Sequence, residues 1–397
     1  MKKIFFLLGN NLLNKFSTHL LKIIPDLTII ECSSKPQKSP YHLLLPKGKE
    51  FETIVKFSEN KQVVGVLNRA DHYENLHGKL VDYFEVPGPS FAAINQVGNK
   101  ANLHLLMDDL NLQLFRPKTI ICQLTEVAEL LKNIQFPVML KPFVGAHSRG
   151  VTKLESVDDF NHVYPQLYEH FLAEPAAEDP NNKTVLIEEY LPGKQITPIC
   201  YVDSKGKVHF ISLVKITNAR DLNQNHYQII YRTTPSNTKE PIQQKMKFVL
   251  QKIAKASLLK ETFLDPEFFV DGDNIYLIEI NVRMGGFRQE LAKPAFDIDL
   301  EKMIVQLALR QEVEDQFNVI GSATACEIWE QKSGTIKKIK IPKSKHIAHS
   351  RVNFNPGDYY DAPPEGNKAL GSFYVRSTEK SLKIAKKLRN KVVIEFE

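Results

Sequence analysis

Short apolar runs alternate with helical patterns over roughly the first ninety residues of the chain. The apolar runs have the length of single strands, and they read KIFFLLG, LTIIEC, YHLLLP, VVGVL and DYFEVPG. The segments HLLKIIP and FETIVKFSE between them repeat their apolar residues at helical spacing. Strands that alternate with helices are typical of parallel sheets with crossover helices. The pattern therefore predicts a small doubly wound α/β domain over residues 1–95.

An amphipathic helix is predicted directly after this domain, over residues 99–114. Its sequence, NKANLHLLMDDLNLQL, places Leu103, Leu106, Leu110 and Leu114 along one side, at the spacing of a buried helical face. The change from alternating short elements to one longer helix marks the start of a second domain.

Mixed strand and helix patterns then continue to the end of the chain. The strand candidates PKTIICQL, PVMLKPF and VLIEEYLPG flank the helix candidate TEVAELLKNI, which predicts a lid subdomain over about residues 119–190 within a domain 96–320. The Pro-, Asn- and acid-rich residues 173–183 are predicted to form a surface loop. Several strand candidates and a final amphipathic helix predict a small C-terminal α+β subdomain over residues 321–397. The fold class is thus α/β and α+β, with more than one domain.

Polar residues of three kinds follow one another along the apolar strand YLIEINVRMGG, residues 276–286. Side chains alternate across a strand, so Leu277, Glu279, Asn281 and Arg283 are predicted to share one face, opposite a wholly apolar one. Glutamate and asparagine supply the oxygen ligands that a hard cation such as Mg²⁺ prefers. An arginine one step further along the strand could bind a phosphate or a developing oxyanion.

A second carboxylate is predicted to lie beside this strand. The runs FFVD and NIYLIEINVR indicate a β-hairpin with its turn at Gly272. Cross-strand pairing would then bring Glu267 close to Glu279. Two neighbouring carboxylates need a cation to offset their repulsion, so Glu267 joins Glu279 and Asn281 as a candidate metal ligand.

A lysine inside an apolar strand is the third candidate feature. Lys141 lies between Leu140 and Pro142, and it is costly to bury unless it is paired with a phosphate or with a structural glutamate. The loop that follows offers backbone N–H groups, a hydroxyl and an arginine charge to phosphate oxygens, and its members are Gly145, His147, Ser148, Arg149 and Gly150. Both partners for Lys141 stay open at this point.

The strand VLIEEYLPGKQI, residues 185–196, ends in two glutamates, an aromatic residue and a Pro-Gly turn. Free backbone groups at such a strand exit could bind the edge of a purine, and a carboxylate or amide nearby could hold its amino group or the ribose hydroxyls. An ordinary junction between a strand and a turn explains the same residues.

Composition and charge favour a globular protein and argue against some classes of function. The 397 residues, 43% hydrophobic and 25% charged, are typical of a globular protein of two or three domains. The net charge of +6 is mild and acidic residues are interleaved, which argues against a dedicated nucleic-acid binder. The densest basic stretch, TIKKIKIPKSKH, is interpreted as a solvated strand.

The cysteines and the apolar segments indicate in which compartment of the cell the protein is expected. Four scattered cysteines suggest neither a zinc site nor disulfides, so we expect a reducing cytoplasm. The opening MKKIFFLLGNNLL has an apolar run of only five residues and is interpreted as a first strand, not as a signal peptide. No stretch approaches the roughly 18 apolar residues that span a bilayer, so no membrane partner is expected.

In their order along the chain, these motifs resemble the ATP-grasp superfamily of carboxylate–amine ligases. The motifs are NK at Lys100, Lys141 with GAHSRG, EEYLPG, and EINVRMGG. The resemblance covers most of the chain and implies the ATP-grasp fold, with a doubly wound pre-grasp domain before it and a small C-terminal domain after it. The layout VPGPSFAAI, NK, RMGG and GSFYVRSTEKSLKIAKKL is most similar to L-amino-acid or dipeptide ligases within the superfamily.

For the nucleotide, the resemblance implies ATP with its phosphates on Lys100, Lys141 and the loop from Gly145 to Gly150, of which Lys141, Ser148 and Arg149 would take part in catalysis. The adenine would lie against Glu188, Glu189 and the backbone near Tyr190 and Leu191, and position 195 would hold the ribose.

For the metal and the substrates, the resemblance implies that Glu267, Glu279 and Asn281 bind two Mg²⁺ ions, with Mn²⁺ as an alternative. Arg283 would steady the transferring phosphoryl group and the tetrahedral intermediate. Gly285, Gly286 and Arg288 would lie at the substrate, where Arg288 is a candidate for binding a carboxylate or a structural arginine.

The implied reaction is ATP-dependent joining of a carboxylate to an amine through an acyl phosphate, with release of ADP and phosphate. Small-molecule acids and amines, amino acids first among them, are the expected partners, and a homodimer is an additional expectation. The chain departs from the family where glycines are common, at Ala146 and His147, and at Gln195, where an acidic residue is usual. These departures motivate one alternative, an ATP-binding module without turnover. A bicarbonate-using carboxylase is the other alternative.

Overall fold

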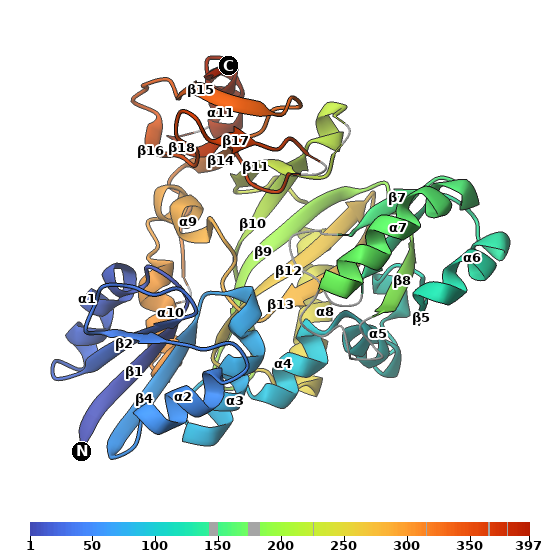
Figure 1. Ribbon diagram of the computed structural model, residues 1–397. Coiled ribbons are helices and arrows are strands. Elements are labelled where there is room, and N and C mark those ends of the chain that lie inside the picture. Colours follow the sequence, from blue (N-terminus) through green and yellow to red (C-terminus); the bar gives the residue numbers. More distant parts are fainter. Residues whose placement is uncertain (143–149, 174–182, 225, 315, 364–365, 379) are drawn as a thin grey trace.

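The computed structural model describes residues 1–142, 150–173, 183–224, 226–314, 316–363, 366–378 and 380–397. Strands in these residues form four sheets. Figure 1 shows an N-terminal α/β unit and a lid sheet on either side of the hairpin β12–β13, with a C-terminal unit at the far end of the large sheet. This is the multidomain α/β and α+β class that the sequence predicts.

The N-terminal sheet is wholly parallel, in the order β3-β2-β1-β4. Its strands are β1 (Lys2–Leu8), β2 (Thr28–Ser33), β3 (His42–Leu44) and β4 (Lys61–Asn68). The helices of this region are α1 (Leu13–Ile23), α2 (Glu50–Phe57) and α3 (Glu74–Phe84), the last preceded by the 3₁₀ turn η1 (Asp71–Tyr73). Parallel strands joined by helices confirm the predicted doubly wound topology, and residues 2–8 form a first strand as expected.

The predicted strand DYFEVPG is wrong, because Asp82, Tyr83 and Phe84 belong to helix α3. Helical spacing continues through this run, since Leu80 and Val81 already face the core and the aromatic rings that follow also pack. The Tyr83 ring lies 5.5 Å from that of Phe51 and the Phe84 ring 6.3 Å from that of Phe6. The helix ends at Glu85, which adopts a left-handed conformation.

Two capped helices lead into the second part of the chain. Ser90 and Asn99 cap α4 (Phe91–Gly98) and α5 (Lys100–Asp109) by accepting backbone N–H groups of the first turn. Helix α5 ends sooner than predicted, because Asn111 has a φ of +56° that breaks the helix. Leu103 and Leu106 are buried as expected, but Leu114 lies in the turn η2 (Gln113–Phe115) and is 86% exposed, so its predicted place in the core is wrong.

The lid sheet is antiparallel, in the order β5-β8-β6-β7. Its strands are β5 (Thr119–Gln123), β6 (Val138–Pro142), β7 (Thr152–Leu154) and β8 (Thr184–Glu189). The helices α6 (Val127–Leu130), between the 3₁₀ turns η3 (Leu124–Glu126) and η4 (Leu131–Asn133), and α7 (Val157–Ala173) accompany the sheet, and the lid has a hydrophobic core of its own. Most of the predicted loop 173–183 lies outside the described residues.

The large sheet has eight antiparallel strands in the order β13-β12-β9-β10-β11-β14-β18-β16. Their bounds are β9 (Lys194–Val202), β10 (Val208–Asn218), β11 (Ile229–Thr234), β12 (Thr262–Asp271), β13 (Asn274–Asn281), β14 (Ser322–Ile328), β16 (Ile347–Val352) and β18 (Gly371–Ser377). The 3₁₀ turn η6 (Arg220–Leu222) follows β10, and helix α8 (Glu240–Ala256) buries its apolar side against one face of the sheet.

The C-terminal unit adds a small sheet, β17-β15-β19, and the helix α11 (Ser381–Arg389). Its strands are β15 (Gly334–Lys340), β17 (Tyr359–Tyr360) and β19 (Val393–Phe396). On β15 the side chain of Ile336 is buried, whereas Lys337, Lys338 and Lys340 are exposed. The basic stretch is therefore a solvated strand, as predicted.

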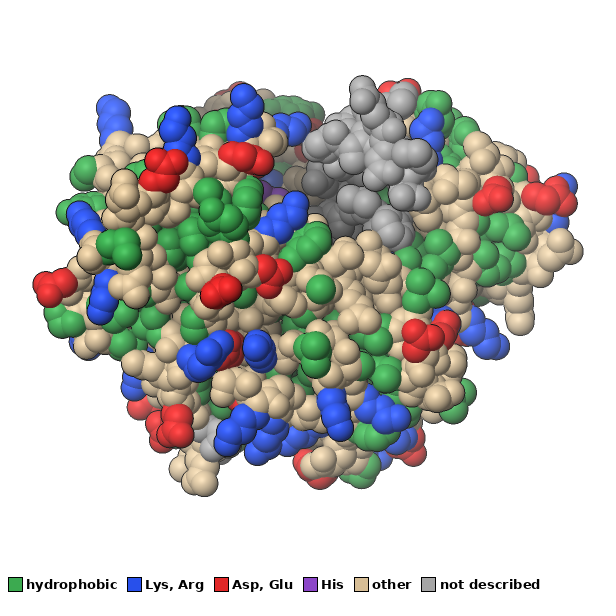
Figure 2. Space-filling view, turned by 90° about the horizontal axis from the view of Figure 1, so that it is seen from below, with side chains coloured by type: hydrophobic (Ala, Val, Ile, Leu, Met, Phe, Trp, Pro, Cys, Tyr) green, Lys and Arg blue, Asp and Glu red, His purple; other side chains and the backbone are tan. Residues whose placement is uncertain are grey.

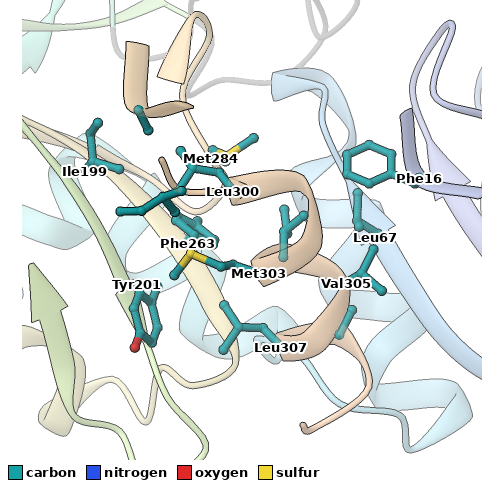
Figure 3. Packing of buried hydrophobic residues seen from close by; sticks show 14 of the residues in the cluster. Phe16, Leu67, Ile199, Tyr201, Phe263, Met284, Leu300, Met303, Val305 and Leu307 are labelled. Carbon is teal, nitrogen blue, oxygen red and sulfur yellow. The ribbon is translucent and has the colours of Figure 1, made fainter. Parts of the chain in front are cut away.

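Helices α9 (Arg288–Phe296) and α10 (Leu300–Ala308) connect the N-terminal sheet to the large sheet. Figure 3 shows Leu300, Met303 and Leu307 near Phe263 and Tyr201 of the large sheet, and Val305 near Leu67 of β4. One continuous core thus fixes the N-terminal unit beside the hairpin β12–β13.

The surface has no dominant sign of charge on the face shown in Figure 2, where acidic and basic side chains are interspersed. Within the described residues, none of the helices combines the length and the apolar character needed to cross a bilayer.

Candidate functional site

Two carboxylates face each other across the hairpin, as predicted. Glu267 of β12 is paired in register with Glu279 of β13, and the Nδ2 atom of Asn281 lies 3.4 Å from Glu279 Oε1. The strand differs from strict alternation by a bulge, which inserts Ile278. Because of this bulge Leu277 belongs to the buried core, so its predicted place on the face of Glu279 is wrong.

The two carboxylates have opposite pKa shifts. Burial, reinforced by the charge of Glu279, raises the pKa of Glu267 to about 8. Burial acts in the same direction on Glu279, but the Lys100 ammonium, 2.9 Å away, lowers the pKa of Glu279 below its usual range. At neutral pH Glu267 is therefore mostly protonated, whereas Glu279 is ionised and paired with Lys100.

These residues fit a hard divalent cation. Their donor atoms are carboxylate and amide oxygens, and a bound cation would offset both the burial and the repulsion that keep Glu267 protonated. Gln195 on β9 adds an amide whose Nε2 donates to Glu267 Oε2 at 2.8 Å. An acidic residue at position 195 would instead place a third carboxylate beside this pair, which gives a physical reason for glutamine there.

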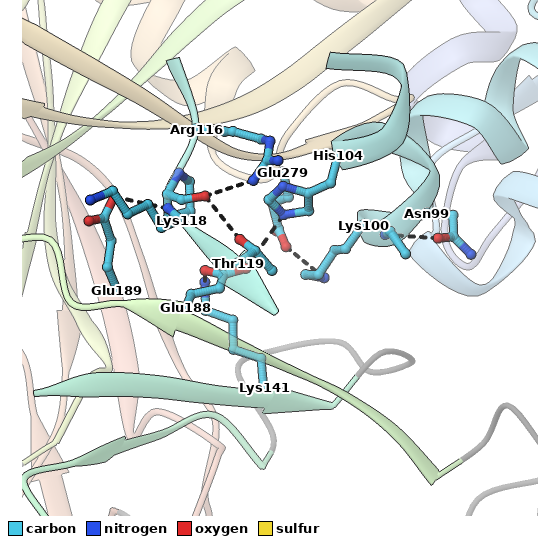
Figure 4. A network of polar contacts seen from close by, with 12 residues as sticks. Asn99, Lys100, His104, Arg116, Lys118, Thr119, Lys141, Glu188, Glu189 and Glu279 are labelled. Carbon is cyan, nitrogen blue, oxygen red and sulfur yellow. Dashed lines mark hydrogen bonds and ion pairs between the residues drawn. The ribbon is translucent and has the colours of Figure 1, made fainter. Parts of the chain in front are cut away.

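Lysine and histidine side chains meet a buried glutamate on the lid side of the site (Figure 4). Glu188 of β8 is 2% exposed, accepts a hydrogen bond from Lys141 Nζ, and lies 3.6 Å from His104 Nε2. Burial opposes ionisation of Glu188, but Lys141 and then His104 lower its pKa to about 2. In this structure Lys141 therefore has the structural glutamate as its partner, one of the two alternatives that the sequence leaves open.

The residues expected at the adenine lie where β8 leaves the lid. Glu189 is turned outward, and its Oε1 accepts the backbone N–H of Lys118 at 2.9 Å. Tyr190 lies beneath Lys153, whose Nζ is 4.3 Å from the ring centre, and Leu191 is half-buried beside it. Glu189 thus fixes the start of β5. Glu188 is the glutamate of this pair that points into the site.

Most of the predicted phosphate loop, namely Gly145, His147, Ser148 and Arg149, lies outside the described residues. Gly150, its last residue, has a φ of +70°, and a Cβ atom there would lie 2.7 Å from Pro142 Cγ. Glycine is therefore required where the loop rejoins β7.

Arg283 lies at the centre of an acidic cluster that joins the hairpin to the N-terminal unit. Its Nε donates to Asp71 and lies 3.5 Å from Glu74, and its Nη1 lies 3.7 Å from Asp265. Burial alone would lower the pKa of Arg283, but these three carboxylates raise it. Burial raises the pKa of Glu74 to about 7, although Arg283 and the Val282 N–H act against this.

Arg288 shares the carboxylate of Asp265 with Arg283. Its Nη2 donates to Asp265 Oδ1 at 2.7 Å, while its Nε and Nη1 have no hydrogen-bond partner among the residues that the structure describes. A Cβ atom at Gly285 would lie within 2.5 Å of the Asp265 carboxylate, whereas one at Gly286 would meet nothing within 4 Å. Gly285 thus makes room for Asp265, and Gly286 borders open space.

Sequence reasoning missed His104 and the carboxylates of Asp71, Glu74 and Asp265. Asp265 stands two residues before Glu267 on β12, so strand alternation could have indicated it. His104 stands four residues after Lys100 on α5, which is helical spacing toward the same side. No sequence signal connects Asp71 and Glu74 to Arg283, because that contact joins residues more than two hundred positions apart.

A family model described as "ATP-grasp domain" matches residues 134–290, which include Lys141, Glu188, Glu267, Glu279 and Asn281. Two curated proteins are similar to the chain at low identity. An uncharacterized protein, y4rH, from Sinorhizobium fredii is 23% identical over 295 residues, which cover 72% of this chain and 57% of that protein. A D-alanine–D-alanine ligase from Phocaeicola vulgatus is 23% identical over 164 residues, which cover 40% of this chain and 46% of that protein. The chain thus spans about half the length of these curated relatives.

Solved structures match the chain over nearly its whole length. An L-amino acid ligase from Bacillus licheniformis superposes with a TM-score of 0.86 at 15% identity, covering 100% of this chain and 99% of that one. A biotin carboxylase from Campylobacter jejuni superposes with a TM-score of 0.70 at 17% identity, covering 99% and 92%. The resemblance predicted from the sequence is thereby confirmed: the chain carries an ATP-grasp domain, and its fold is that of the ATP-grasp superfamily.

Proposed function

We propose that the protein is an ATP-dependent ligase that activates a carboxylate as an acyl phosphate and joins it to an amine. Amino acids are the proposed substrates. The observation that carries this proposal is the pair Glu267 and Glu279, which face each other with Lys100 on one of them and an elevated pKa on the other. The match to an ATP-grasp domain and the fold shared with an L-amino acid ligase support it.

The nucleotide is proposed to lie between the lid sheet and the large sheet. Lys100 and Lys141 would hold its phosphates together with the loop 145–150, and Glu188 would face the adenine with the backbone of residues 190 and 191. Gln195 would bind the ribose through the amide that already contacts Glu267. Each of these groups would bind and orient the nucleotide, and positioning is most of the protein's part in phosphoryl transfer.

Glu267, Glu279 and Asn281 are proposed to hold two Mg²⁺ ions, with Mn²⁺ as a substitute. Bound there, the ion would neutralise phosphate charge as a Lewis acid. The chain's own part is to keep these oxygens in register on one hairpin and to give up the proton of Glu267 when the cation binds.

Arg283 and Arg288 are proposed to act on the substrates. Arg283 would face the transferring phosphoryl group and the tetrahedral intermediate, and the carboxylates around it would keep it charged and fixed. Arg288, whose Nε and Nη1 lack partners among the described residues, would bind the substrate carboxylate beside Gly285 and Gly286. The amine would then attack the acyl phosphate, forming the C–N bond and releasing phosphate.

The predicted domain bounds, 1–95, 96–320 with a lid at about 119–190, and 321–397, stay proposals, as do a homodimer and a cytoplasmic location. They rest on the sequence pattern and on the fold shared with relatives.

The test is phosphate release from ATP and Mg²⁺ with a panel of amino acids offered as both acid and amine. We expect release that depends on two amino acids and yields a dipeptide. Turnover that needs bicarbonate and no amino acid would favour the carboxylase alternative, for which the biotin carboxylase fold is the motivation. Nucleotide binding without any ADP formation would favour a binding module.

A further inference from the structure

His104 is a buried histidine whose two ring nitrogens both lack a hydrogen-bond partner within the described part of the chain. The residue is 4% exposed and lies on α5, in the middle of the proposed nucleotide site. A buried polar atom without a partner is costly, and in a native protein it calls for an explanation such as a catalytic role, a bound ion or a bound water. The imidazole therefore calls for an explanation.

The neighbour of His104 is also incompletely bonded. Glu188 Oε2 accepts the hydrogen bond of Lys141, but Glu188 Oε1 is buried without one and lies 3.6 Å from His104 Nε2. Figure 4 shows His104 and Lys100 extending from the same helix, one toward Glu188 and the other toward Glu279. A shift of a few tenths of an ångström would turn this approach into a hydrogen bond.

Lys141 has two possible anionic partners, the carboxylate of Glu188 and the phosphates of the proposed nucleotide. Glu188 is 2% exposed and needs a cation to remain ionised, and Lys141 supplies it in this structure. The proposed function asks the same ammonium to bind the nucleotide phosphates. If Lys141 turns to the phosphates, Glu188 is left as a buried charge without a hydrogen-bonded cation.

We propose that His104 is a positioning residue that forms a hydrogen bond to Glu188 and so releases Lys141 to the phosphates of the nucleotide. This inference rests on the nucleotide binding proposed above. His104 acts through Glu188 and Lys141 and touches no reacting atom.

The groups around His104 allow this exchange. They are Lys100 on its own helix, Glu188 on β8, Lys141 on β6 and, beyond Lys100, Glu279 on β13. A ring N–H of His104 that donates to Glu188 Oε1 keeps this carboxylate hydrogen-bonded when Lys141 leaves it for the phosphates.

The experiment is calorimetric titration of MgADP into the full-length chain, its His104→Gln variant, and the control His162→Gln on the exposed side of α7. We expect His104→Gln to weaken MgADP binding about tenfold, the worth of a hydrogen bond to a charged group, and the control to bind as the wild type does.

A second arm separates positioning from support of the fold. In a Lys141→Met background, His104→Gln should have almost no further effect, because there is no lysine to release. An equal loss in both backgrounds would overturn the proposal.

Should His104→Gln not fold, the wild type itself gives the answer by NMR of its His104 ring. MgADP is expected to shift the ¹⁵N resonance of His104 Nε2, because this nitrogen forms a hydrogen bond to Glu188, and an unchanged resonance would overturn the proposal. A wild type that binds MgADP but makes no amide leaves this test intact and refutes only the ligase. A wild type that binds no nucleotide refutes both.

Discussion

At the scale of single residues, chemically identical groups in the site behave differently because their neighbours differ. Burial and the charge of Glu279 raise the pKa of Glu267 to about 8, while Lys100 lowers that of Glu279. For the proposed cation, Glu279 already carries its charge, whereas Glu267 would first have to lose a proton. The position of the two carboxylates could be predicted from the sequence, since strand alternation and hairpin pairing suffice to place them.

Replacing Glu279 with glutamine should abolish turnover without unfolding the protein. The amide keeps the shape of the side chain but removes the charge that holds Lys100 and would hold the cation. We expect Mg²⁺-dependent phosphate release to fall by at least about 100-fold. The control is Glu59→Gln, an exposed glutamate of the N-terminal unit, which should keep full activity. Full activity of the Glu279→Gln variant would contradict the metal assignment.

The two neighbouring glycines at 285 and 286 should respond differently to alanine. A Cβ atom at Gly285 would lie 2.4 Å from Asp265 Oδ2, so Asp265 must move and its bond to Arg288 must break or lengthen. We expect Gly285→Ala to lower the free energy of unfolding by about 1–3 kcal/mol, which denaturant titration measures. Gly286→Ala, where the Cβ atom meets open space, is the matched control and should change stability little. Equal effects of the two would contradict the described packing around Asp265.

At the scale of elements, the departures from prediction have local causes. The bulge at Ile278 turns Leu277 into the core, and a single extra residue in a strand leaves no mark on a hydrophobic pattern. Helix α3 extends through a run that resembles a strand, because aromatic residues satisfy both patterns. Helix α5 ends early near Asn111, because the left-handed backbone of this residue stops the helix and the apolar pattern does not show it.

Helix α3 should also make stability depend on pH. His77 packs against β4 with one ring nitrogen 3.2 Å from the Val66 carbonyl oxygen, and burial lowers its pKa from 6.5 to about 4, although that carbonyl acts against the shift. Between these values the unfolded chain binds a proton that the folded chain does not, so the free energy of unfolding falls as the pH falls. We expect a loss of about 2 kcal/mol from His77 alone between pH 7 and 5.

Urea titrations of the wild type and of His77→Gln at the two pH values check this. The variant should lose about 2 kcal/mol less than the wild type over the same interval. Parallel losses in the two proteins would show that His77 does not titrate as a buried neutral residue.

At the scale of the whole molecule, the order of motifs along the chain indicates the fold, whereas the contacts between distant segments cannot be predicted from the sequence. The sequence patterns predict the doubly wound unit, the lid strands and the hairpin, each of which is local. The anchoring of Arg283 by Asp71 and Glu74 depends on how α10 joins the N-terminal sheet to the large sheet, and no periodicity encodes that contact. Contacts of this kind bring the N-terminal unit into the proposed site.

The most direct test of the account follows one oxygen atom. If the carboxylate attacks the γ-phosphate of ATP and an amine then displaces phosphate, one carboxylate oxygen must leave with that phosphate. An amino acid labelled with ¹⁸O in its carboxylate is incubated with the protein, ATP, Mg²⁺ and an amine, and the released phosphate is analysed by mass spectrometry. An acyl phosphate intermediate predicts one ¹⁸O atom in each phosphate formed together with an amide. Unlabelled phosphate, formed at the same rate with or without the acid, would contradict it.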